Sequence, residues 1–197
     1  MPSASAPPKD KIARPQEFQG ATFSQREIAR GNYENCIFAG CILPKSDLSG
    51  SRFVDCEFRN CDLSLSKVNH TAFRNIRFRG SKLVGLHFEN CNPLGFSASF
   101  EGCQLNLSSF FRLNLKQTVF KECDLREVDF TESNLTEVLF GNCDLSGAIF
   151  SRTILERTDF RTAVNYSLDP ELNRIKKARF SLMGVPGLLD KYNIEIE

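Results

Sequence analysis

Large apolar residues recur at every fifth position along most of the chain. Starting at Phe18, each step of five residues reaches a Phe, Leu, Ile, Val or Tyr as far as Phe88, and the series resumes at Phe100 and continues to Phe160. Of the 18 Phe, 16 lie in this register once Phe180 is included. A period of five fits neither the 3.6-residue turn of an α-helix nor the two-residue alternation of a strand. It predicts a solenoid in which each unit of five residues forms one short side and one corner.

A second inward position lies two residues before each large apolar residue. It carries mostly Cys, Ser, Thr or Ala, because a small side chain must share the narrow interior with Phe or Leu. Four units then close a square coil of 20 residues. All eight cysteines occupy this small inward position: Cys36, Cys41, Cys56, Cys61, Cys91, Cys103, Cys123 and Cys143. We interpret them as buried core residues, with metal binding as the alternative, because no Cys-x-x-Cys spacing occurs.

Five-residue units of one pattern carry a family resemblance. The pattern is a small residue, Asp or Asn, Leu or Phe, a polar residue and a variable one. Units that follow it include 46–50, 61–65, 123–127, 133–137 and 143–147. They resemble the pentapeptide-repeat family. The resemblance implies an all-β fold, a right-handed quadrilateral β-helix of about seven to eight coils, with a short C-terminal helical cap.

The ends of the chain differ from the repeat. We expect residues 1–15 to be a disordered tail rich in Pro, Ser and Ala. Residues 16–180 should form the β-helix, with a register break at 89–99 and a loop at 165–177. Residues 181–197 should form a C-terminal helix or cap that serves as a dimerisation segment.

The register break is the first candidate site. Phe88 and Phe100 are 12 residues apart, two more than two units require. Between them stand Asn92, Pro93, Leu94, Gly95 and Phe96, which include the Pro and Gly typical of a bulge or turn. Two interpretations are open: a kink whose apolar residues fill the core, or a loop that binds a partner.

The C-terminus is the second candidate site. A short helix is predicted from Pro186 to Tyr192, with the proline in its first turn. A dense set of apolar residues surrounds it: Leu182, Val185, Leu188, Leu189, Tyr192, Ile194 and Ile196. This ending resembles the Qnr-type quinolone-resistance branch of the family, which implies a homodimer formed through this segment. A cap that covers only its own coil is the alternative.

Composition argues against catalysis. The chain contains 2 His and no Trp, and its net charge is +1. His70 and His87 share no motif, and no phosphate-binding glycine motif occurs. We therefore expect no enzyme, no catalytic or metal-binding residues and no cofactor. The balanced charge predicts no direct binding of nucleic acid. The lack of a long apolar run predicts no membrane span, and the N-terminus has no apolar signal core, so we expect a cytoplasmic protein.

Outward charged residues 20 positions apart should be neighbours on adjacent coils. Eight such pairs have opposite charge: Asp47 with Lys67, Glu57 with Arg77, Asp62 with Lys82, Glu101 with Lys121, Arg112 with Glu132, Glu132 with Arg152, Glu137 with Arg157, and Asp159 with Arg179. This pattern predicts a surface that neutralises itself from coil to coil.

The predicted function is a non-catalytic scaffold that binds another protein. The resemblance to the Qnr-type branch implies an alternative, a mimic of duplex DNA that binds and protects or modulates DNA gyrase or topoisomerase IV. Such a mimic needs an acidic surface. The candidate acidic residues are Glu122, Asp124, Glu127, Asp129, Glu132, Glu137 and Asp144.

Overall fold

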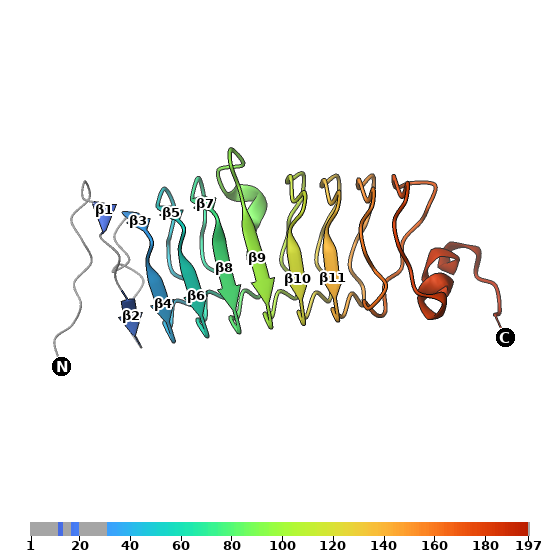
Figure 1. Ribbon diagram of the computed structural model, residues 1–197, viewed down its shortest axis with the longest axis horizontal. Helices are drawn as coiled ribbons and strands as arrows, with labels where there is room; N and C mark the ends of the chain where they lie inside the picture. Colours follow the sequence, from blue (N-terminus) through green and yellow to red (C-terminus); the bar gives the residue numbers. More distant parts are fainter. Residues whose placement is uncertain (1–11, 14–16, 20–30, 197) are drawn as a thin grey trace.

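The computed structural model describes residues 12–13, 17–19 and 31–196, which form a rod of stacked coils (Figure 1). The strands are β1 (Ile12–Ala13), β2 (Glu17–Gln19), β3 (Asn32–Glu34), β4 (Ile37–Ala39), β5 (Arg52–Val54), β6 (Glu57–Arg59), β7 (Ala72–Arg74), β8 (Ile76–Arg79), β9 (Ala98–Glu101), β10 (Val119–Lys121) and β11 (Leu139–Gly141). Three short 3-10 helices are η1 (Phe88–Asn90), η2 (Leu182–Leu188) and η3 (Asp190–Tyr192). None of the helices in the described ranges is long and apolar enough to cross a membrane.

Each coil has four sides, which we number in the order the chain follows. Side 1 is a parallel sheet of seven strands in the order β2, β4, β6, β8, β9, β10 and β11. Sides 2 and 3 follow, and their coils are joined by isolated parallel bridges, such as Asp62 with Lys82 on side 2 and Ser109 with Asp129 on side 3. Side 4 carries the parallel sheet β1, β3, β5 and β7, and the chain then returns to side 1. Paired residues are 20 apart, as in Phe38 with Phe58, so the five-residue unit sets the fold.

Two aromatic stacks run through the core. On side 1 the rings stack in parallel along the whole rod, for example Phe100 on Phe120 with centroids 4.9 Å apart. The second stack lies on side 4 in the N-terminal half, where Phe53 stacks on Phe73. It lies on side 3 in the C-terminal half, beginning with Phe88 on Phe110 at 4.6 Å. The second stack therefore changes sides at the register break, and Leu replaces Phe on side 4 beyond it.

The small inward residues bind the coils to each other. The hydroxyl of Ser66 donates to the carbonyl of Leu43, and that of Thr71 donates to the carbonyl of Leu48, at 2.6 and 2.9 Å. The thiol of Cys61 donates to the carbonyl of Phe38 at 3.2 Å. All eight cysteines are free and buried, which agrees with their interpretation as core residues. The family fold expected from the repeat is therefore present.

The number of coils is slightly lower than expected if only strands are counted. The seven-stranded sheet spans about six turns, against the seven to eight coils that the repeat predicts. Isolated bridges continue the register beyond β11, from Leu139 to Asp159 and from Asp159 to Arg179. The last coils thus keep the pairing but form no strands.

Both ends differ in detail from the expectation. Ile12 and Ala13, within the predicted tail, form β1 and pair with β3. The rest of the tail lies outside the described residues. At the other end the predicted helix from Pro186 to Tyr192 is replaced by η2 and η3, and Pro186 lies inside η2 rather than in a first turn. In an α-helix that began at Leu182, the amide of residue 186 would donate to the carbonyl of Leu182, and Pro186 has no N–H for that bond.

Candidate partner-binding site at the register break

The register break forms a loop on side 4. The amide of Asn92 still donates to the carbonyl of Thr71 in the preceding coil, and the amide of Ser97 donates to that of Phe73. The four residues between them leave the ladder. Pro93 has no N–H to donate, and the amide of Leu94 donates to the Asn92 side chain at 3.0 Å. The four-stranded sheet of side 4 therefore ends at β7, and the loop stands out from the rod (Figure 1).

The loop is held against the preceding coil by Gly95 and Arg74. Gly95 has φ 75°, and a Cβ on it would lie 3.2 Å from the Nε atom of Arg74. This Nε is buried and has no hydrogen-bond partner among the described residues. Phe96 turns inward and packs edge-on against Phe88, with ring centroids 6.1 Å apart. The break is therefore a packed turn with an arginine beneath it.

A hollow of about 330 Å³ lies beside the loop on side 4. Its lining residues are Phe96, Ser97, Ala98, Asn114, Lys116, Gln117 and Thr118. It exists because the coil that contains the break adds no strand after β7, so the next coil has no side-4 strand to pack against. The hollow is large enough for one side chain of a partner.

Leu94 is the tip of the loop and is 74% exposed. If the break were a simple kink, its apolar residues would fill the core. Phe96 does pack against the core, whereas Leu94 does not. The sequence therefore located the loop, but Arg74 and the hollow were missed. The signal that could have found Arg74 is the coil length, because residues about 20 positions before the loop must lie beneath it.

The seven candidate acidic residues are not brought together. Glu122 lies at the corner between sides 1 and 2, and Glu127 lies at the corner between sides 2 and 3. Asp124 and Asp144 belong to side 2, and Asp129 belongs to side 3. Glu132 and Glu137 lie at the two corners that flank side 4. In the part of the chain that the structure describes, these seven carboxylates therefore do not form one continuous acidic surface.

Several of these carboxylates are already paired. Glu132 lies 2.7 Å from both Arg112 and Arg152, and Glu137 lies 2.8 Å from Arg157. Asp124 pairs with Arg126 at 2.7 Å, and the hydrogen bond from Arg126 holds the pKa of Asp124 below its usual range. Five of the eight pairs predicted from the 20-residue spacing are ion pairs: Glu101 with Lys121, Arg112 with Glu132, Glu132 with Arg152, Glu137 with Arg157, and Asp159 with Arg179.

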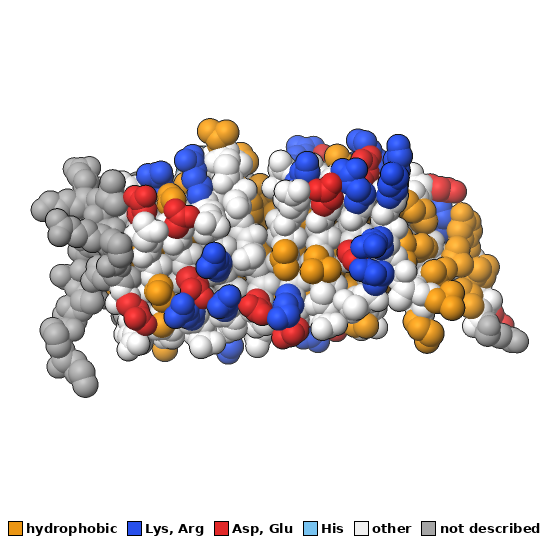
Figure 2. Space-filling model, in the orientation of Figure 1, with side chains coloured by type: hydrophobic (Ala, Val, Ile, Leu, Met, Phe, Trp, Pro, Cys, Tyr) orange, Lys and Arg blue, Asp and Glu red, His pale blue; other side chains and the backbone are white. Residues whose placement is uncertain are grey.

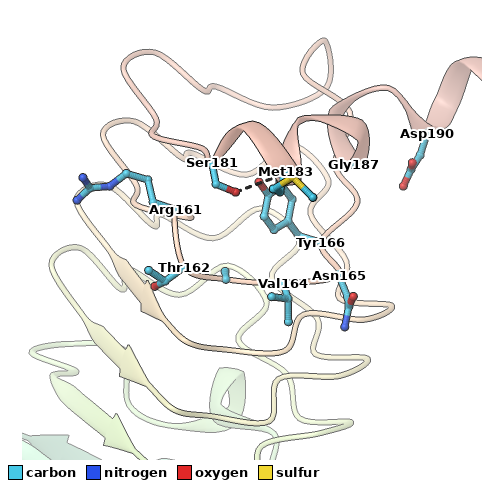
Figure 3. Close-up of a pocket in the computed structure, with 11 residues that line it drawn as sticks. Arg161, Thr162, Val164, Asn165, Tyr166, Ser181, Met183, Gly187 and Asp190 are labelled. Atoms are coloured by element: carbon cyan, nitrogen blue, oxygen red, sulfur yellow. Dashed lines mark hydrogen bonds between the residues drawn. The ribbon is translucent and has the colours of Figure 1, made fainter. Parts of the chain in front are cut away.

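The C-terminal cap sits on the last coil through two glycines. A Cβ on Gly184 would overlap the hydroxyl of Tyr166, and one on Gly187 would overlap the Tyr166 carbonyl oxygen. A hollow of about 610 Å³ lies between η2 and the last coil, and Figure 3 shows Tyr166 between the two. Lys191 pairs with Asp169 at 2.8 Å and ties η3 to the segment 165–172. The expected loop at 165–177 is shorter, because Arg174 already pairs with Ile154 in the ladder of side 4.

The apolar residues of the cap are largely exposed. Leu182 and Met183 are 87% and 89% exposed, and no residue of η2 or η3 is buried. Of the seven candidate interface residues, Leu188 and Leu189 are half-buried, and the other five are exposed. Figure 2 shows the resulting hydrophobic surface at the C-terminal end of the rod.

The remaining candidate chemistry is sparse. His87 Nδ1 lies 2.8 Å from Glu89 Oε1 on side 3. Burial raises the pKa of the Cys56 thiol to about 12, so this group stays protonated at neutral pH. Within the described ranges, no cluster of three or more His, Cys, Asp or Glu could hold a metal ion.

Comparisons with known proteins agree with the repeat. A family model described as "Pentapeptide repeat region" matches residues 17–92 and 96–165, and the match is interrupted at the break loop. The structure of full-length QnrB1, a plasmid-mediated fluoroquinolone resistance protein, is similar with a TM-score of 0.57 and 16% identity, covering 91% of this chain and 98% of that one. HetL from Nostoc sp. strain PCC 7120 is 17% identical with a TM-score of 0.34, covering 87% and 90%. No curated protein sequence matches the chain significantly.

Proposed function

Because the chain belongs to the pentapeptide-repeat family, we propose that it is a non-catalytic scaffold that binds another protein through the break loop on side 4. The family supplies the fold, and function has to be argued from the surface. Outward residues of the repeat are nearly free to vary, so we expect a partner to bind where the surface departs from the repeat.

Leu94 is the observation that carries this proposal. At 74% exposed, Leu94 is the most exposed large apolar side chain in the described coils before the cap, so little of it contributes to the core. The loop holds it beside a hollow that fits one partner side chain. An apolar anchor next to a pocket is the usual centre of a protein interface.

Rigidity of the rod supports a scaffold role. The aromatic stack of side 1 continues through the break, because Phe78 stacks on Phe100 with ring centroids 5.3 Å apart. A partner that binds at the loop therefore meets a preformed surface, which lowers the entropic cost of association.

Site-specific photocrosslinking tests the proposal. A photoreactive phenylalanine analogue is placed at position 94, and a matched control is placed at position 107, where Leu107 is 54% exposed on a corner of side 2. We expect a defined crosslinked protein from position 94 only. Co-purification of that protein should be lost in Leu94→Asp and retained in Leu107→Asp. Identical products from both positions, or none from position 94, would contradict the proposal.

A second candidate function is binding of DNA gyrase or topoisomerase IV as a mimic of duplex DNA. The resemblance of the C-terminus to the Qnr-type branch favours it, whereas the pairing of Asp124, Glu132 and Glu137 with arginines weakens it. The test is gyrase supercoiling with and without a fluoroquinolone across a titration of this protein. Rescue or inhibition supports the mimic, and an unchanged gyrase activity rejects it.

We further propose that two copies associate through the cap. The exposed Leu182 and Met183 support this, because a monomer gains nothing from presenting them to water.

Eight free thiols support residence in the reducing cytoplasm.

A further inference from the structure

Side 4 is more basic than the rest of the protein. Together with the two corners that flank it, it carries nine basic residues: Arg52, Arg74, Arg112, Lys116, Arg152, Arg157, Arg174, Lys176 and Lys177. The acidic residues there are five: Glu34, Asp55, Glu132, Glu137 and Glu156. Side 4 thus has a net charge of +4, whereas the whole chain has +1. Figure 2 shows Lys and Arg side chains over both halves of the face that it draws, with one group along the upper edge toward the C-terminal end.

The positive charges form the outer layer of this side. Arg112, Arg152, Arg157 and Arg174 have side chains that are 53–67% exposed, and each reaches a carboxylate at 2.6–2.8 Å. The carboxylates, those of Glu132, Glu137 and Glu156, are only 26–31% exposed. A partner therefore meets guanidinium groups first.

Other basic residues of side 4 lie outside the ion pairs. Arg52, Arg74, Lys176 and Lys177 make no ion pair with any described residue. Lys116 lines the hollow beside the loop and lies near Glu137, whose pKa is lowered by a hydrogen bond from Gln117 and by the charges of Arg157 and Lys116. All of these cations except Arg52 lie at the break loop or between it and the C-terminal end.

We propose that side 4 binds an extended acidic segment of the partner protein. This proposal rests on the function proposed above. One apolar side chain of the segment packs against the exposed Leu94. Its carboxylates pair with Lys116 in the polar hollow and with Arg152, Lys176 and Lys177. Lys116 and Lys176 lie three coils apart, about 14 Å at the spacing of paired strands. About five extended residues cover that distance.

The same features disfavour a nucleic acid. A phosphate backbone carries a charge on every residue, so some phosphates would face Glu132, Glu137 or Glu156. Side 4 exposes no aromatic ring in its described part, whereas single strands are held by stacking on such rings. A peptide can place neutral residues opposite the recessed carboxylates, and it can supply an apolar side chain that packs against Leu94.

The test is fluorescence anisotropy on the full chain with a labelled peptide of twelve residues, eleven Glu and one central Leu. We expect binding that weakens with salt, and binding at least about tenfold weaker when Gln replaces Glu. Replacing the central Leu by Gly should weaken binding several-fold. The double variant Lys116→Glu, Lys176→Glu should lose about tenfold in affinity.

The matched control is Lys45→Glu, Lys82→Glu, which changes the net charge equally on the opposite side 2. We expect less than about a twofold effect from it. Equal losses in the two double variants would overturn the proposal, because binding would then follow net charge alone. Tighter binding of a 20-base-pair duplex, lost in the side 4 variant, would also overturn it in favour of a nucleic acid.

This result is separate from the crosslinking test. A partner crosslinked at position 94 together with no peptide binding would reject only the acidic segment. The absence of any crosslinked partner would reject the scaffold function itself.

Discussion

Gly95 lies against the side chain of Arg74, and this contact fastens the break loop to the coil before it. The conformation of Gly95, with φ 75°, is shared by other corner residues, and some corner glycines, such as Gly147, approach the preceding coil just as closely. At Gly102, with φ 61°, the nearest atom to an added Cβ lies 3.8 Å away. Comparing substitutions at Gly95 and Gly102 therefore distinguishes the free-energy cost of the left-handed backbone from the free-energy cost of the contact with Arg74.

Gly95→Ala should destabilise the protein more than Gly102→Ala. A left-handed conformation costs alanine about 1–2 kcal/mol at either position, and only Gly95 adds the contact with Arg74. Urea unfolding of the two variants measures the difference. Adding Arg74→Ala to Gly95→Ala should remove that difference. Equal unfolding midpoints for the two single variants would show that the loop does not rest on Arg74.

Most of the fold could be predicted because one side chain in five decides it. Phe and Leu recur with a single period, and a pair such as Phe38 and Phe58 stacks because 20 residues close one coil. The 3-10 cap could not be predicted in detail. Its path depends on the fit of Gly184 and Gly187 over Tyr166, which is a contact between segments and leaves no pattern in the sequence.

Phe110 and Phe111 offer a direct comparison of an inward and an outward ring. Phe110 is buried and stacks on both Phe88 and Phe130, whereas Phe111 is half-buried and lies beside Arg112 at 4.7 Å. Phe110→Ala should cost about 3–5 kcal/mol of unfolding free energy. Phe111→Ala should cost less than about 1 kcal/mol. Similar losses in a chemical denaturation series would contradict the assignment of the register.

The candidate site was predicted only in part. Counting residues from Phe88 to Phe100 locates the loop, and the coil period predicts ion pairs such as Arg112 with Glu132. The period does not reveal that Glu57 pairs with Arg59 and Arg79. It also does not reveal that carboxylates lie beneath guanidinium groups, because depth depends on side-chain length and conformation.

The cysteines should be unreactive in the folded protein. Burial raises the pKa of Cys56 to about 12, and burial also raises the pKa of Cys91. These two thiols therefore remain protonated at pH 8. A hydrogen bond with Cys123 lowers the pKa of Cys143, but this thiol is buried in the core like the other seven. A thiol-specific disulfide reagent should modify none of the eight in the native state and all of them in denaturant. Rapid stoichiometric labelling without denaturant would show that the coils open.

Asp159 should make stability sensitive to acid. Its hydrogen bond from Arg161 lowers its pKa, so its contribution is present above the ordinary Asp value, about 3.9. That contribution is lost as the pH falls through the lowered pKa. Asp159→Asn should therefore destabilise the protein at pH 6, by less than about 1 kcal/mol because solvent screens the pair. The difference should shrink at low pH, and a difference independent of pH would exclude the ion pair as its source.

Association through the cap should depend on its exposed apolar residues. Leu182 and Ile194 are exposed and have no contact that the monomer needs, so Leu182→Asp with Ile194→Asp should leave the fold intact. Light scattering of the wild type should give about twice 22.3 kDa, and the double variant should give the monomer mass. Leu107→Asp is the control, because it adds a charge at an exposed leucine far from the cap. A wild-type monomer at the highest soluble concentration would mean that the cap only closes its own coil, and charges on it would then change solubility without changing mass.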